Sequence, residues 1–350
     1  MNKVRVVIWG FGAMGSGMAK MLLSKKGFEI TGVCDTRPDR TGKSIFDLTG
    51  MERGTHPEVI VEKDIEKAVA HSADIALLAT DSFTAKAFNK IIFLVEKGLN
   101  VITTAEEMAY PRASEPELSR KIDDAAKRQG VSVLGTGINP GLIMDLLVVL
   151  MSGACIDVEH IEAKRVNSLS PFGPAVMEEQ GVGLNPSVFE EGVKNGTLSG
   201  HVGFNESVRM IADALGWRLD GKVQQAMRPI VSHVPRKTEY ASIKTGDVAG
   251  CDMRGSGVVD GENKIEMIHP QQIEPQDAGI ETGDYITIKG TPDIHLSIKP
   301  EVPGGIGTIA MCVNMIPQVI NTSPGLKTML DLPVPRALMG DVRERIERRG

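Results

Sequence analysis

"VVIWGFGAMGSGMAKML", residues Val6–Leu22, is the stretch that decides the fold expected for this chain. An apolar run of strand length ends on three glycines, Gly10, Gly12 and Gly15, and a helical pattern follows at once. Glycines in this G-x-G-x-x-G spacing permit a tight turn, bring backbone N–H groups to a pyrophosphate and let the positive end of a helix approach it. We therefore predict a dinucleotide site here, with a plain strand–turn–helix link as the alternative. The cofactor contacts expected in the turn are Gly10, Phe11, Gly12, Ala13, Met14 and Gly15.

Strand-like and helix-like segments alternate through the first 140 residues. Strands separated by helices of this length are typical of βαβ units, whose strands form a parallel sheet. We therefore predict an α/β fold with a doubly wound, Rossmann-type domain over residues 1–140. After the first strand at Val4–Trp9, the expected strands are Phe28–Cys34, Val59–Ile60, Asp74–Thr80, 100–107 and 131–135, and the expected helices are Gly15–Ser24, Ile65–Ala70, Thr84–Gly98 and 115–130.

From residue 141 to residue 303 the pattern changes to successive strand-like pieces broken by Gly and Asp. Only two helices are evident, Pro186–Asn195 and Asn205–Leu215. This pattern predicts a mostly antiparallel sheet in an α+β domain for substrate binding and oligomerisation. The stretch "GGIGTIAMCVNMIPQVINTSPG", Gly304–Gly325, is expected to be one buried helix despite Pro317. Residues 304–350 are expected to pack back on the first domain.

Composition and charge limit the class of protein and its partners. The net charge of −6 disfavours a nucleic-acid partner, and no segment approaches the ~20 apolar residues of a membrane span. The four cysteines are far apart in the sequence, which disfavours a disulfide framework or a zinc site and favours a reducing compartment. The histidines show no metal-ligand spacing either. We therefore expect a cytoplasmic protein with no metal, no nucleic acid and no membrane partner.

Further cofactor contacts are expected where the strands end. Asp35 ends the second strand, where a carboxylate accepts hydrogen bonds from the ribose hydroxyls and favours NAD. Arg37 follows two residues later; it is either a solvated loop residue or a partner for the 2′-phosphate of NADP. NAD is therefore the expected cofactor, with NADP also accepted. Because ligands bind outside the carboxyl ends of parallel strands, the remaining expected contacts are Thr80, Asp81, Thr103 and Asn139.

The expected catalytic group is a carboxylate in the segment "NVITTAEE", where Glu106 and Glu107 follow an apolar strand. Alcohol oxidation usually relies on His, Lys, Tyr or a metal to manage the proton, whereas a carboxylate suits an amine substrate. It holds an ammonium group, takes its proton and stabilises an iminium ion by charge. Acidic residues also favour the first turn of a helix, so one of the two glutamates has a structural alternative.

Four motifs together resemble the 2,4-diaminopentanoate dehydrogenases and native amine dehydrogenases, within the dihydrodipicolinate reductase-like group. They are "IWGFGAMGSGMAK", "VITTAEEMAYP", "GTGINPG" and "MIPQVINTSPGLKTMLDLP", and the resemblance covers essentially the whole chain. It implies the NAD(P)-dependent oxidative deamination of 2,4-diaminopentanoate to 2-amino-4-oxopentanoate and ammonia, a step of ornithine fermentation. Glu106 is the ammonium-handling residue that the resemblance indicates, and Glu107 is the alternative. By analogy with this superfamily we expect a homodimer or homotetramer.

The rest of such a substrate, a carboxylate and a second ammonium group, needs partners in the second domain. The segment "EAKRVNSLSPFGP" offers Arg165 as a bidentate carboxylate clamp, with Asn167 and Ser168 as hydrogen-bonding groups. Tyr110 is expected either to line the substrate pocket or to pack in the core. The alternative functions are an imine or carbonyl reductase, an amine dehydrogenase of broader specificity, and a regulator that senses NAD(H) without turnover. The absence of a helix-turn-helix pattern, a basic face and an effector module disfavours the last.

Overall fold

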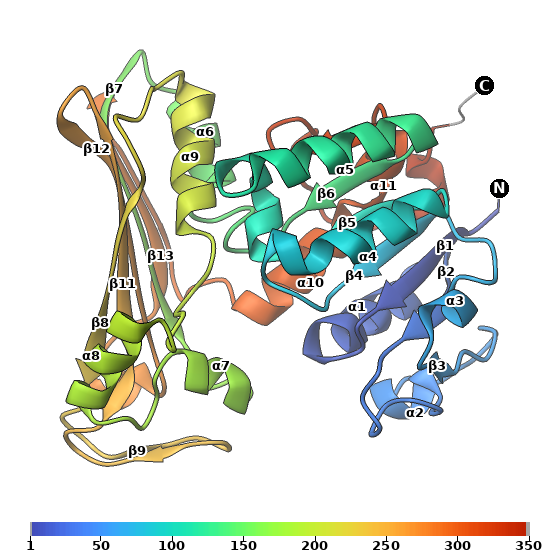
Figure 1. Cartoon of the computed structure of the whole chain (residues 1–350), viewed down its shortest axis with the longest axis horizontal. Coiled ribbons are helices and arrows are strands. Elements are labelled where there is room, and N and C mark those ends of the chain that lie inside the picture. The colour runs from blue at the N-terminus through green and yellow to red at the C-terminus, as the bar shows by residue number, and fades with distance from the viewer. Residues whose placement is uncertain (1, 348–350) are drawn as a thin grey trace. The chain divides into compact units, whose positions relative to one another are not determined.

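The protein divides into two compact units in a computed structural model that describes residues 2–347 (Figure 1). Unit 1 comprises Met1–Leu142 together with Gly304–Gly350, and unit 2 comprises Ile143–Pro303. The expected boundaries lie after residues 140 and 303. Unit 1 therefore takes its residues from both ends of the chain, and unit 2 is inserted between them.

Unit 1 is built around a seven-stranded parallel sheet with the strand order β15-β6-β5-β4-β1-β2-β3. The order of the first six strands, 3-2-1-4-5-6, is that of dinucleotide-binding sheets. The strands are β1 (Val4–Trp9), β2 (Phe28–Cys34), β3 (Val61–Glu62), β4 (Ile75–Leu78), β5 (Asn100–Thr103), β6 (Ser132–Gly135) and β15 (Gly325–Lys327). The predicted doubly wound parallel sheet is confirmed.

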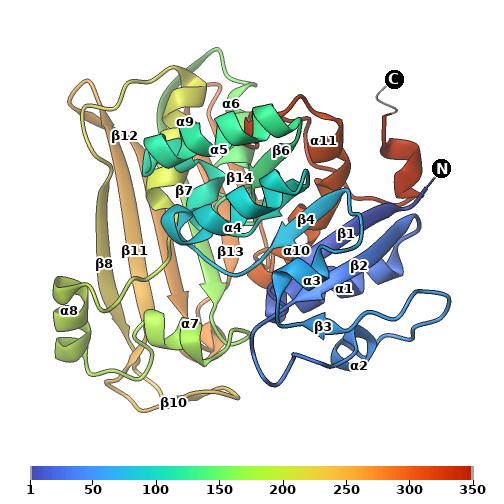
Figure 2. The same ribbon diagram turned by 45° about the vertical axis from the view of Figure 1, so that its right-hand side comes forward.

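Helices cover both faces of this sheet (Figures 1 and 2). On one face α4 and α5 pack together over β5 and β6, and on the other α1 packs against α10 while α11 contacts β5 and β6. The helices of unit 1 are α1 (Ala13–Ser24), α2 (Ile45–Thr49), α3 (Ile65–Ala68), α4 (Thr84–Glu96), α5 (Pro116–Gln129), α10 (Gly304–Asn314) and α11 (Ile316–Asn321). The 3₁₀ turns of unit 1 are η1 (Glu106–Ala109), η2 (Pro111–Ala113) and η4 (Val342–Arg345).

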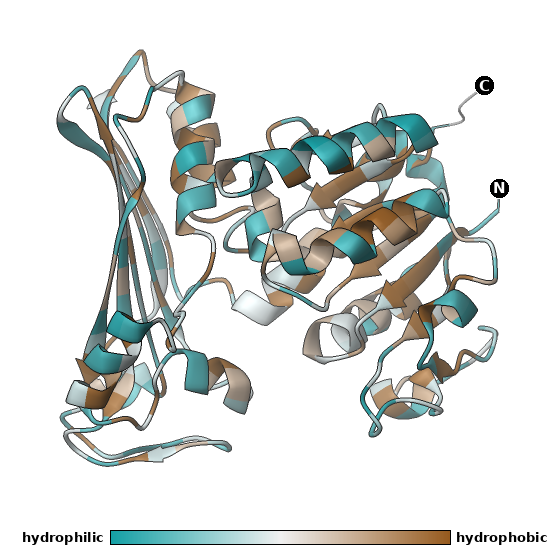
Figure 3. Cartoon of the chain, viewed as in Figure 1, coloured by the Kyte–Doolittle hydropathy of each residue, from teal (hydrophilic) through white to brown (hydrophobic). Residues whose placement is uncertain are grey.

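The sequence of α5 shows why these helices form and where they stop. Pro116 occupies the first turn, where its missing N–H costs no hydrogen bond, and Gly130 ends the helix with a φ of 71°. Ile122 and Ala126 lie on its buried face and join a core that includes Leu94 of α4 and Val101 of β5. Figure 3 shows the outward face of α5 as hydrophilic and the strands beneath as hydrophobic. This amphipathic pattern fixes which face of α5 covers the sheet.

The C-terminal segment returns to unit 1, as predicted, but it is not one helix. Pro317 lies in the first turn of α11, and the chain breaks between α10 and α11 at Met315. A proline lacks the N–H that an uninterrupted helix would require, so the expected single helix over Gly304–Gly325 is wrong. The segment then adds β15 beside β6, a strand that the sequence pattern did not indicate.

Unit 2 contains a six-stranded sheet with the order β14-β13-β7-β12-β11-β8 (Figure 2). Only β7 and β12 pair in parallel, so the predicted mostly antiparallel sheet is confirmed. The strands are β7 (Asp157–Ser168), β8 (Gln224–Val231), β11 (Val248–Val259), β12 (Glu262–Gln272), β13 (Gly283–Thr291) and β14 (Ile294–Ile298), with a separate hairpin of β9 (Arg236–Lys237) and β10 (Ser242–Ile243). The remaining elements are α6 (Leu146–Ser152), α7 (Pro174–Glu179), α8 (Pro186–Asn195), α9 (Phe204–Leu215) and η3 (Pro275–Ala278). The short helices α6 and α7 were not expected.

One face of this sheet is covered by α9, which packs on β11 and β12. The approach is close: a Cβ at Gly257 would lie 2.8 Å from a methyl carbon of Val208. On the opposite face, alternate residues such as Glu162, Lys164 and Glu266 are only partly buried. We call this the uncovered face of unit 2, because no helix of the described chain packs on it in Figure 1.

Candidate functional site

The glycine turn has the geometry of a dinucleotide cradle. Gly10 has a φ of 94°, and a Cβ there would lie 2.8 Å from the carbonyl carbon of Ala79. A Cβ at Gly15 would overlap the carbonyl oxygen of Gly10, so helix α1 packs on the turn without room for a side chain. Gly12 faces open space except for the Arg37 guanidinium, 3.7 Å from its Cβ position. The first and third glycines thus shape the turn, and the second leaves it accessible, which fits a bound pyrophosphate.

Asp35 and Arg37 lie beside this turn at the end of β2. The Asp35 carboxylate is mostly buried and accepts hydrogen bonds from the N–H of Phe11, at 2.6 Å, and from the N–H of Arg37, at 2.8 Å. The Arg37 guanidinium pairs with Asp35 at 3.3 Å and donates to the Phe11 carbonyl at 3.1 Å. Burial raises the pKa of Asp35, but these hydrogen bonds and the arginine charge outweigh burial and hold the pKa below its ordinary value. Asp35 is therefore an anion held against the cofactor turn.

Thr80 and Asp81 follow β4 and are held by Lys90 of α4, a residue that the sequence analysis did not single out. The Lys90 ammonium lies 2.7 Å from Asp81 and 3.0 Å from the Thr80 hydroxyl, which itself donates to Asp81 at 2.5 Å. It also lies over the ring of Trp9, the last residue of β1, 5.9 Å from the centroid. No local signal in the sequence pairs Lys90 with Asp81. The two residues are nine positions apart, and the folded loop before α4 brings Asp81 next to Lys90 on that helix.

Glu106 and Glu107 begin η1 directly after β5, and the structure separates their surroundings. A carboxylate oxygen of Glu107 accepts a hydrogen bond from the N–H of Thr84, the first residue of α4, at 2.8 Å. The N–H of Glu107 donates to the carbonyl of Ser82 at 3.1 Å. Glu107 therefore caps a helix N-terminus that has no other side-chain cap. Glu106 is partly exposed at the start of η1, in the turn that follows β5, the strand that pairs with β4.

Thr103, Asn139 and Tyr110 take different positions at the same edge of the sheet. The Thr103 hydroxyl is buried and accepts a hydrogen bond from the Ala105 N–H at 3.2 Å, so it shapes the start of the β5–η1 turn. Asn139 is partly buried in the loop that follows β6. Tyr110 is 3% exposed, with the Arg112 guanidinium 4.9 Å from its ring centroid. Of these, Asn139 has the exposure that a cofactor contact requires.

The returning helix α10 supports two of the cofactor-side segments. A Cβ at Gly17 of α1 would overlap the side chain of Ile309, which shows how closely α1 and α10 pack. Thr308 accepts a hydrogen bond from the N–H of Ile138 at 3.2 Å, and Ile138 precedes Asn139 in the loop after β6. Thr308 was not among the predicted site residues, since its partner lies 170 residues away in the sequence.

In unit 2, Arg165 is buried in an ion pair with Asp284. Its guanidinium pairs with the Asp284 carboxylate and donates to the Val302 carbonyl at 2.6 Å, and the Val302 N–H donates back to Asp284 at 2.9 Å. Burial raises the pKa of Asp284, and Arg165 and the Val302 N–H oppose that rise. Because one carboxylate already neutralises Arg165, only the remaining N–H groups of its guanidinium are left for the predicted substrate clamp.

Asn167 lies on the same face of β7 as Arg165 and contacts a buried histidine. Its side-chain oxygen is 3.0 Å from Nε2 of His269, whose ring packs edge-on against that of His201 with centroids 4.9 Å apart. Burial, with His201 and Arg165 adding to the effect, lowers the pKa of His269 well below its ordinary value. Ser168 is partly exposed; its N–H donates to the Glu301 carboxylate at 3.3 Å, and its hydroxyl accepts a hydrogen bond from the Ser170 N–H at 3.2 Å. A polar cluster of Arg165, Asn167, His201 and His269 therefore lies on the α9 face of the sheet.

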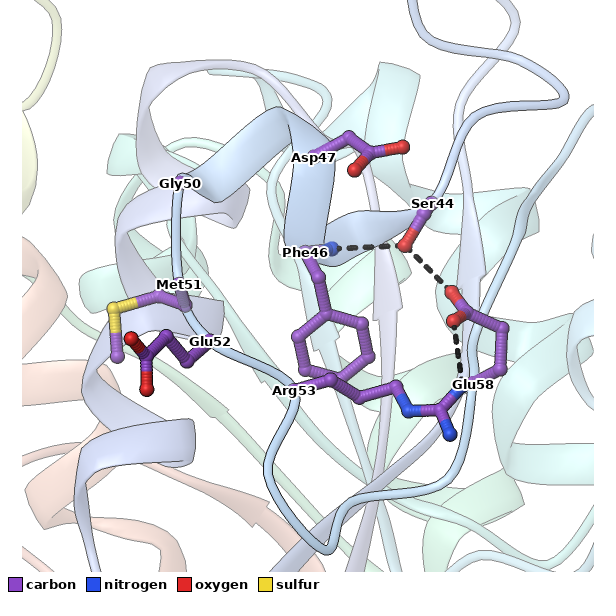
Figure 4. Close-up of a pocket in the computed structure, with 8 residues that line it drawn as sticks. All are labelled: Ser44, Phe46, Asp47, Gly50, Met51, Glu52, Arg53 and Glu58. Atoms are coloured by element: carbon purple, nitrogen blue, oxygen red, sulfur yellow. Dashed lines mark hydrogen bonds and ion pairs between the residues drawn. The ribbon is translucent and has the colours of Figure 1, made fainter.

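Other parts of the described chain offer less chemistry. A hollow beside α2 is lined by both apolar and polar residues, and Glu58 in its lining pairs with Arg53 at 3.1 Å and with Ser44 at 2.5 Å (Figure 4). None of the predicted site residues lines it. Among residues 2–347, no three His, Cys, Asp or Glu side chains are grouped to hold a metal ion. No helix in that range is long and apolar enough to span a membrane.

Comparisons with known proteins identify the family of this chain and relatives with the same fold. A model of the 2,4-diaminopentanoate dehydrogenase C-terminal domain matches residues 142–348, and a model of the dihydrodipicolinate reductase N-terminus matches residues 4–131. A 2,4-diaminopentanoate dehydrogenase from Acetoanaerobium sticklandii is 61% identical over 99% of this chain and 98% of its own. An amine dehydrogenase from Streptomyces virginiae is 22% identical over 96% of this chain and 98% of its own. The solved structure of an amine dehydrogenase from Mycobacterium smegmatis superimposes with a TM-score of 0.86 at 28% identity, covering 96% of this chain and 98% of that one.

Proposed function

Because the chain belongs to the 2,4-diaminopentanoate dehydrogenase family, we propose that it catalyses the NAD(P)-dependent oxidative deamination of 2,4-diaminopentanoate. In this reaction C4 of the substrate loses a hydride, and an oxygen atom from water replaces the C4 amino group. The substrate, oxidised cofactor and water give 2-amino-4-oxopentanoate, ammonium, reduced cofactor and one proton. The observation that carries the proposal is Glu106, a carboxylate at the carboxyl edge of β5, on the sheet edge that also bears the glycine turn.

The proposed cofactor is NAD, with NADP also accepted. The glycine turn supplies the pyrophosphate cradle, and Asp35 lies where ribose hydroxyls bind in such sheets. Arg37 covers part of the Asp35 charge, which reduces the repulsion that a 2′-phosphate would meet. The proposed contacts remain Gly10 to Gly15 with Asp35 and Arg37, and Asn139 in the loop after β6. Thr80, Asp81 and Thr103 support these contacts through the loops that they shape.

The proposed mechanism assigns proton handling to Glu106. Its carboxylate holds the C4 ammonium by charge and accepts the proton that the amine must lose before oxidation. The bound nicotinamide supplies the acceptor for the hydride that leaves C4. Glu106 passes the amine's proton to solvent, so its carboxylate is again charged when it faces the iminium ion and stabilises it electrostatically. It then takes a proton from the water that attacks C4 and returns that proton to the amino group, which leaves as ammonia. Glu107 does not share this role in the proposal, since its carboxylate is bonded to Thr84.

For the rest of the substrate, Arg165, Asn167, Ser168 and Tyr110 remain the proposed contacts. The pairing of Arg165 with Asp284 holds the guanidinium plane in one orientation, which suits recognition of a planar carboxylate through its remaining N–H groups. Of the four, Arg165, Asn167 and Tyr110 are almost completely buried, and Ser168 is partly exposed.

The proposed assembly is a homodimer or homotetramer in the cytoplasm, formed through the uncovered face of unit 2. That face carries both positive and negative side chains: Lys164 of β7 lies over Tyr285, and Glu162 lies two residues before Lys164 on the same strand. Two copies related by a two-fold axis then meet with opposite charges facing. Light scattering on the purified protein measures the mass, and a monomer at micromolar concentration would rule out this assembly.

The function is tested by following NADH formation and ammonia release with purified protein, NAD and 2,4-diaminopentanoate. Ornithine and simple amines serve as comparison substrates, and NADP is assayed in parallel. Turnover on the diamino acid, with one ammonia released per NADH, supports the proposal. Turnover on simple amines alone would indicate an amine dehydrogenase of broader specificity, and silence on every amine would overturn the reaction class.

A further inference from the structure

Lys90 contacts two segments next to the first glycine of the cofactor turn: the end of β1 and the loop after β4. Its ammonium lies over Trp9, which directly precedes Gly10, and it binds the hydroxyl of Thr80. Thr80 in turn packs on Gly10, since a Cβ at that glycine would lie 2.9 Å from the Thr80 methyl carbon. A single side chain from α4 thus touches the strand before the turn and the loop that packs against the turn.

The Lys90 charge also balances an acidic side chain in that loop. Asp81 lies 2.7 Å from Lys90, and the two side chains are 13% and 31% exposed. The field of Lys90 extends to Cys34 at the end of β2, where burial raises the pKa of the thiol to about 11 and Lys90 opposes the rise. The cation therefore acts on the ends of three neighbouring strands, β1, β2 and β4.

An unpaired Asp81 would disfavour a dinucleotide at this edge. The pyrophosphate of the cofactor carries two negative charges, and a carboxylate next to Thr80 would repel them. Asp81 is mostly shielded from water, so solvent alone screens this charge poorly.

We propose that Lys90 is a positioning residue that neutralises Asp81 and holds the β4–α4 loop against the glycine turn, so that the turn accepts a dianionic pyrophosphate. The inference rests on the proposed binding of a dinucleotide at Gly10–Gly15. It also reassigns Asp81, which was expected to contact the cofactor, to the role of counter-ion for Lys90.

The test compares NADH affinity, measured by fluorescence titration, with kcat and the KM for NAD. Lys90→Met leaves Asp81 unpaired, and we expect the NADH Kd and the KM for NAD to rise about tenfold at low ionic strength while kcat changes less. Lys90→Arg keeps the charge and restores binding to within about threefold. Because the repulsion is electrostatic, added salt shrinks the loss caused by Lys90→Met.

Two further variants separate charge from packing. Asp81→Asn removes the carboxylate, so the double variant Lys90→Met/Asp81→Asn regains most of the affinity that Lys90→Met loses. Lys97→Met is the matched control. Lys97, the C-cap residue of α4, also pairs with a carboxylate, that of Glu66 at 3.2 Å, and lies over an aromatic ring, that of Phe93. We expect no change in NADH affinity for this control.

Two results would overturn the inference: a double variant that binds as weakly as Lys90→Met, or a Lys90→Met variant that behaves like Lys97→Met. The titration needs no amine substrate. A wild-type protein that binds NADH but releases no ammonia would therefore refute the proposed substrate, while the comparison of variants still decides the role of Lys90. A wild-type protein that does not bind NADH would overturn both.

Discussion

Glu107 caps helix α4 by accepting a 2.8 Å hydrogen bond from the backbone N–H of Thr84, 23 residues earlier in the chain. This bond joins the loop after β4 to the turn after β5, and the Glu107 N–H to Ser82 carbonyl bond repeats the link. Two adjacent carboxylates therefore have different surroundings. Glu107 is committed to the end of α4, and Glu106 is the first residue of η1.

Replacing Glu106 is expected to abolish most of the deamination. Glu106→Gln keeps the shape of the side chain but cannot accept the substrate proton, so kcat should fall by about 10²–10⁴-fold. NADH affinity should stay the same, because the proposed role of Glu106 does not involve the cofactor's phosphates or ribose. Initial-rate measurements with 2,4-diaminopentanoate, beside fluorescence titration of NADH, check both statements.

Glu107 provides the matched comparison. Glu107→Gln retains an oxygen that accepts from the Thr84 N–H, so it should keep kcat within about tenfold of the wild type. Glu107→Ala removes the cap and should lower the free energy of unfolding by about 1 kcal/mol. An inactive Glu107→Gln protein together with an active Glu106→Gln protein would move the catalytic role to Glu107.

Asp35 is expected to set the preference for NAD over NADP. Asp35→Ala removes the acceptor for the ribose hydroxyls and leaves the Arg37 charge unbalanced, so the ratio of kcat/KM for NAD to that for NADP should fall about tenfold or more. Arg37→Ala should shift the same ratio in the opposite direction. An unchanged ratio in both variants would mean that neither side chain meets the adenosine ribose.

The hydroxyl of Thr308 is expected to support the loop that carries Asn139. Thr308→Val has nearly the same shape but leaves the buried Ile138 N–H without its acceptor, which costs about 1–3 kcal/mol and raises the KM for NAD. Thr308→Ser keeps the hydroxyl and should behave as the wild type. Thr31→Val is the control, because the buried Thr31 hydroxyl has no hydrogen-bond partner in the described chain. Equal effects of Thr308→Val and Thr31→Val would contradict this role.

His269 is expected to make the ligand-free protein less stable in mild acid. Its pKa in the folded state lies well below 6.5, so as the pH falls through about 6.5 the unfolded chain takes up the proton first. The free energy of unfolding therefore decreases as the pH falls below about 6.5, and above that pH His269 causes no such loss. Thermal unfolding at about pH 5.5 and about pH 7.5 measures the difference, and His269→Gln should reduce it. If the stability difference between the two pH values is the same in this variant, other titratable groups cause it and His269 does not.

Local signals account for the parts of the structure that the sequence predicted well. Gly15 is required because it packs on Gly10, five residues earlier, and Gly10 because it packs on Ala79, which follows the adjacent strand β4. Gly130 ends α5 through its own left-handed backbone conformation. Such requirements appear directly in the sequence as glycines at defined spacing. The helices expected at Thr84–Gly98 and 115–130 correspond to α4 and α5, and each contributes apolar residues such as Leu94 and Ile122 to the buried core.

The features that were missed depend on contacts between distant residues. β15 is three residues long and exists because it pairs with β6, nearly two hundred positions earlier. The partner of Arg165 is Asp284, and that of Asp81 is Lys90, and neither pairing has a sequence signature. The short helices α6 and α7 also lack the length that periodicity needs. Side-chain pairing across the fold therefore set the partners of Arg165 and Asp81, which the sequence alone did not indicate.

The two-part construction of unit 1 has a consequence for how this chain is made. During synthesis, residues 143–303 leave the ribosome before the segment that supplies α10, α11 and β15. Unit 2 can therefore complete its sheet while the cofactor-binding unit still lacks one edge strand and the helix that packs on α1. The glycine turn and α1 gain the packing of α10 only after residues 304–314 have been made, so a chain that terminates before residue 304 presents this turn without that support.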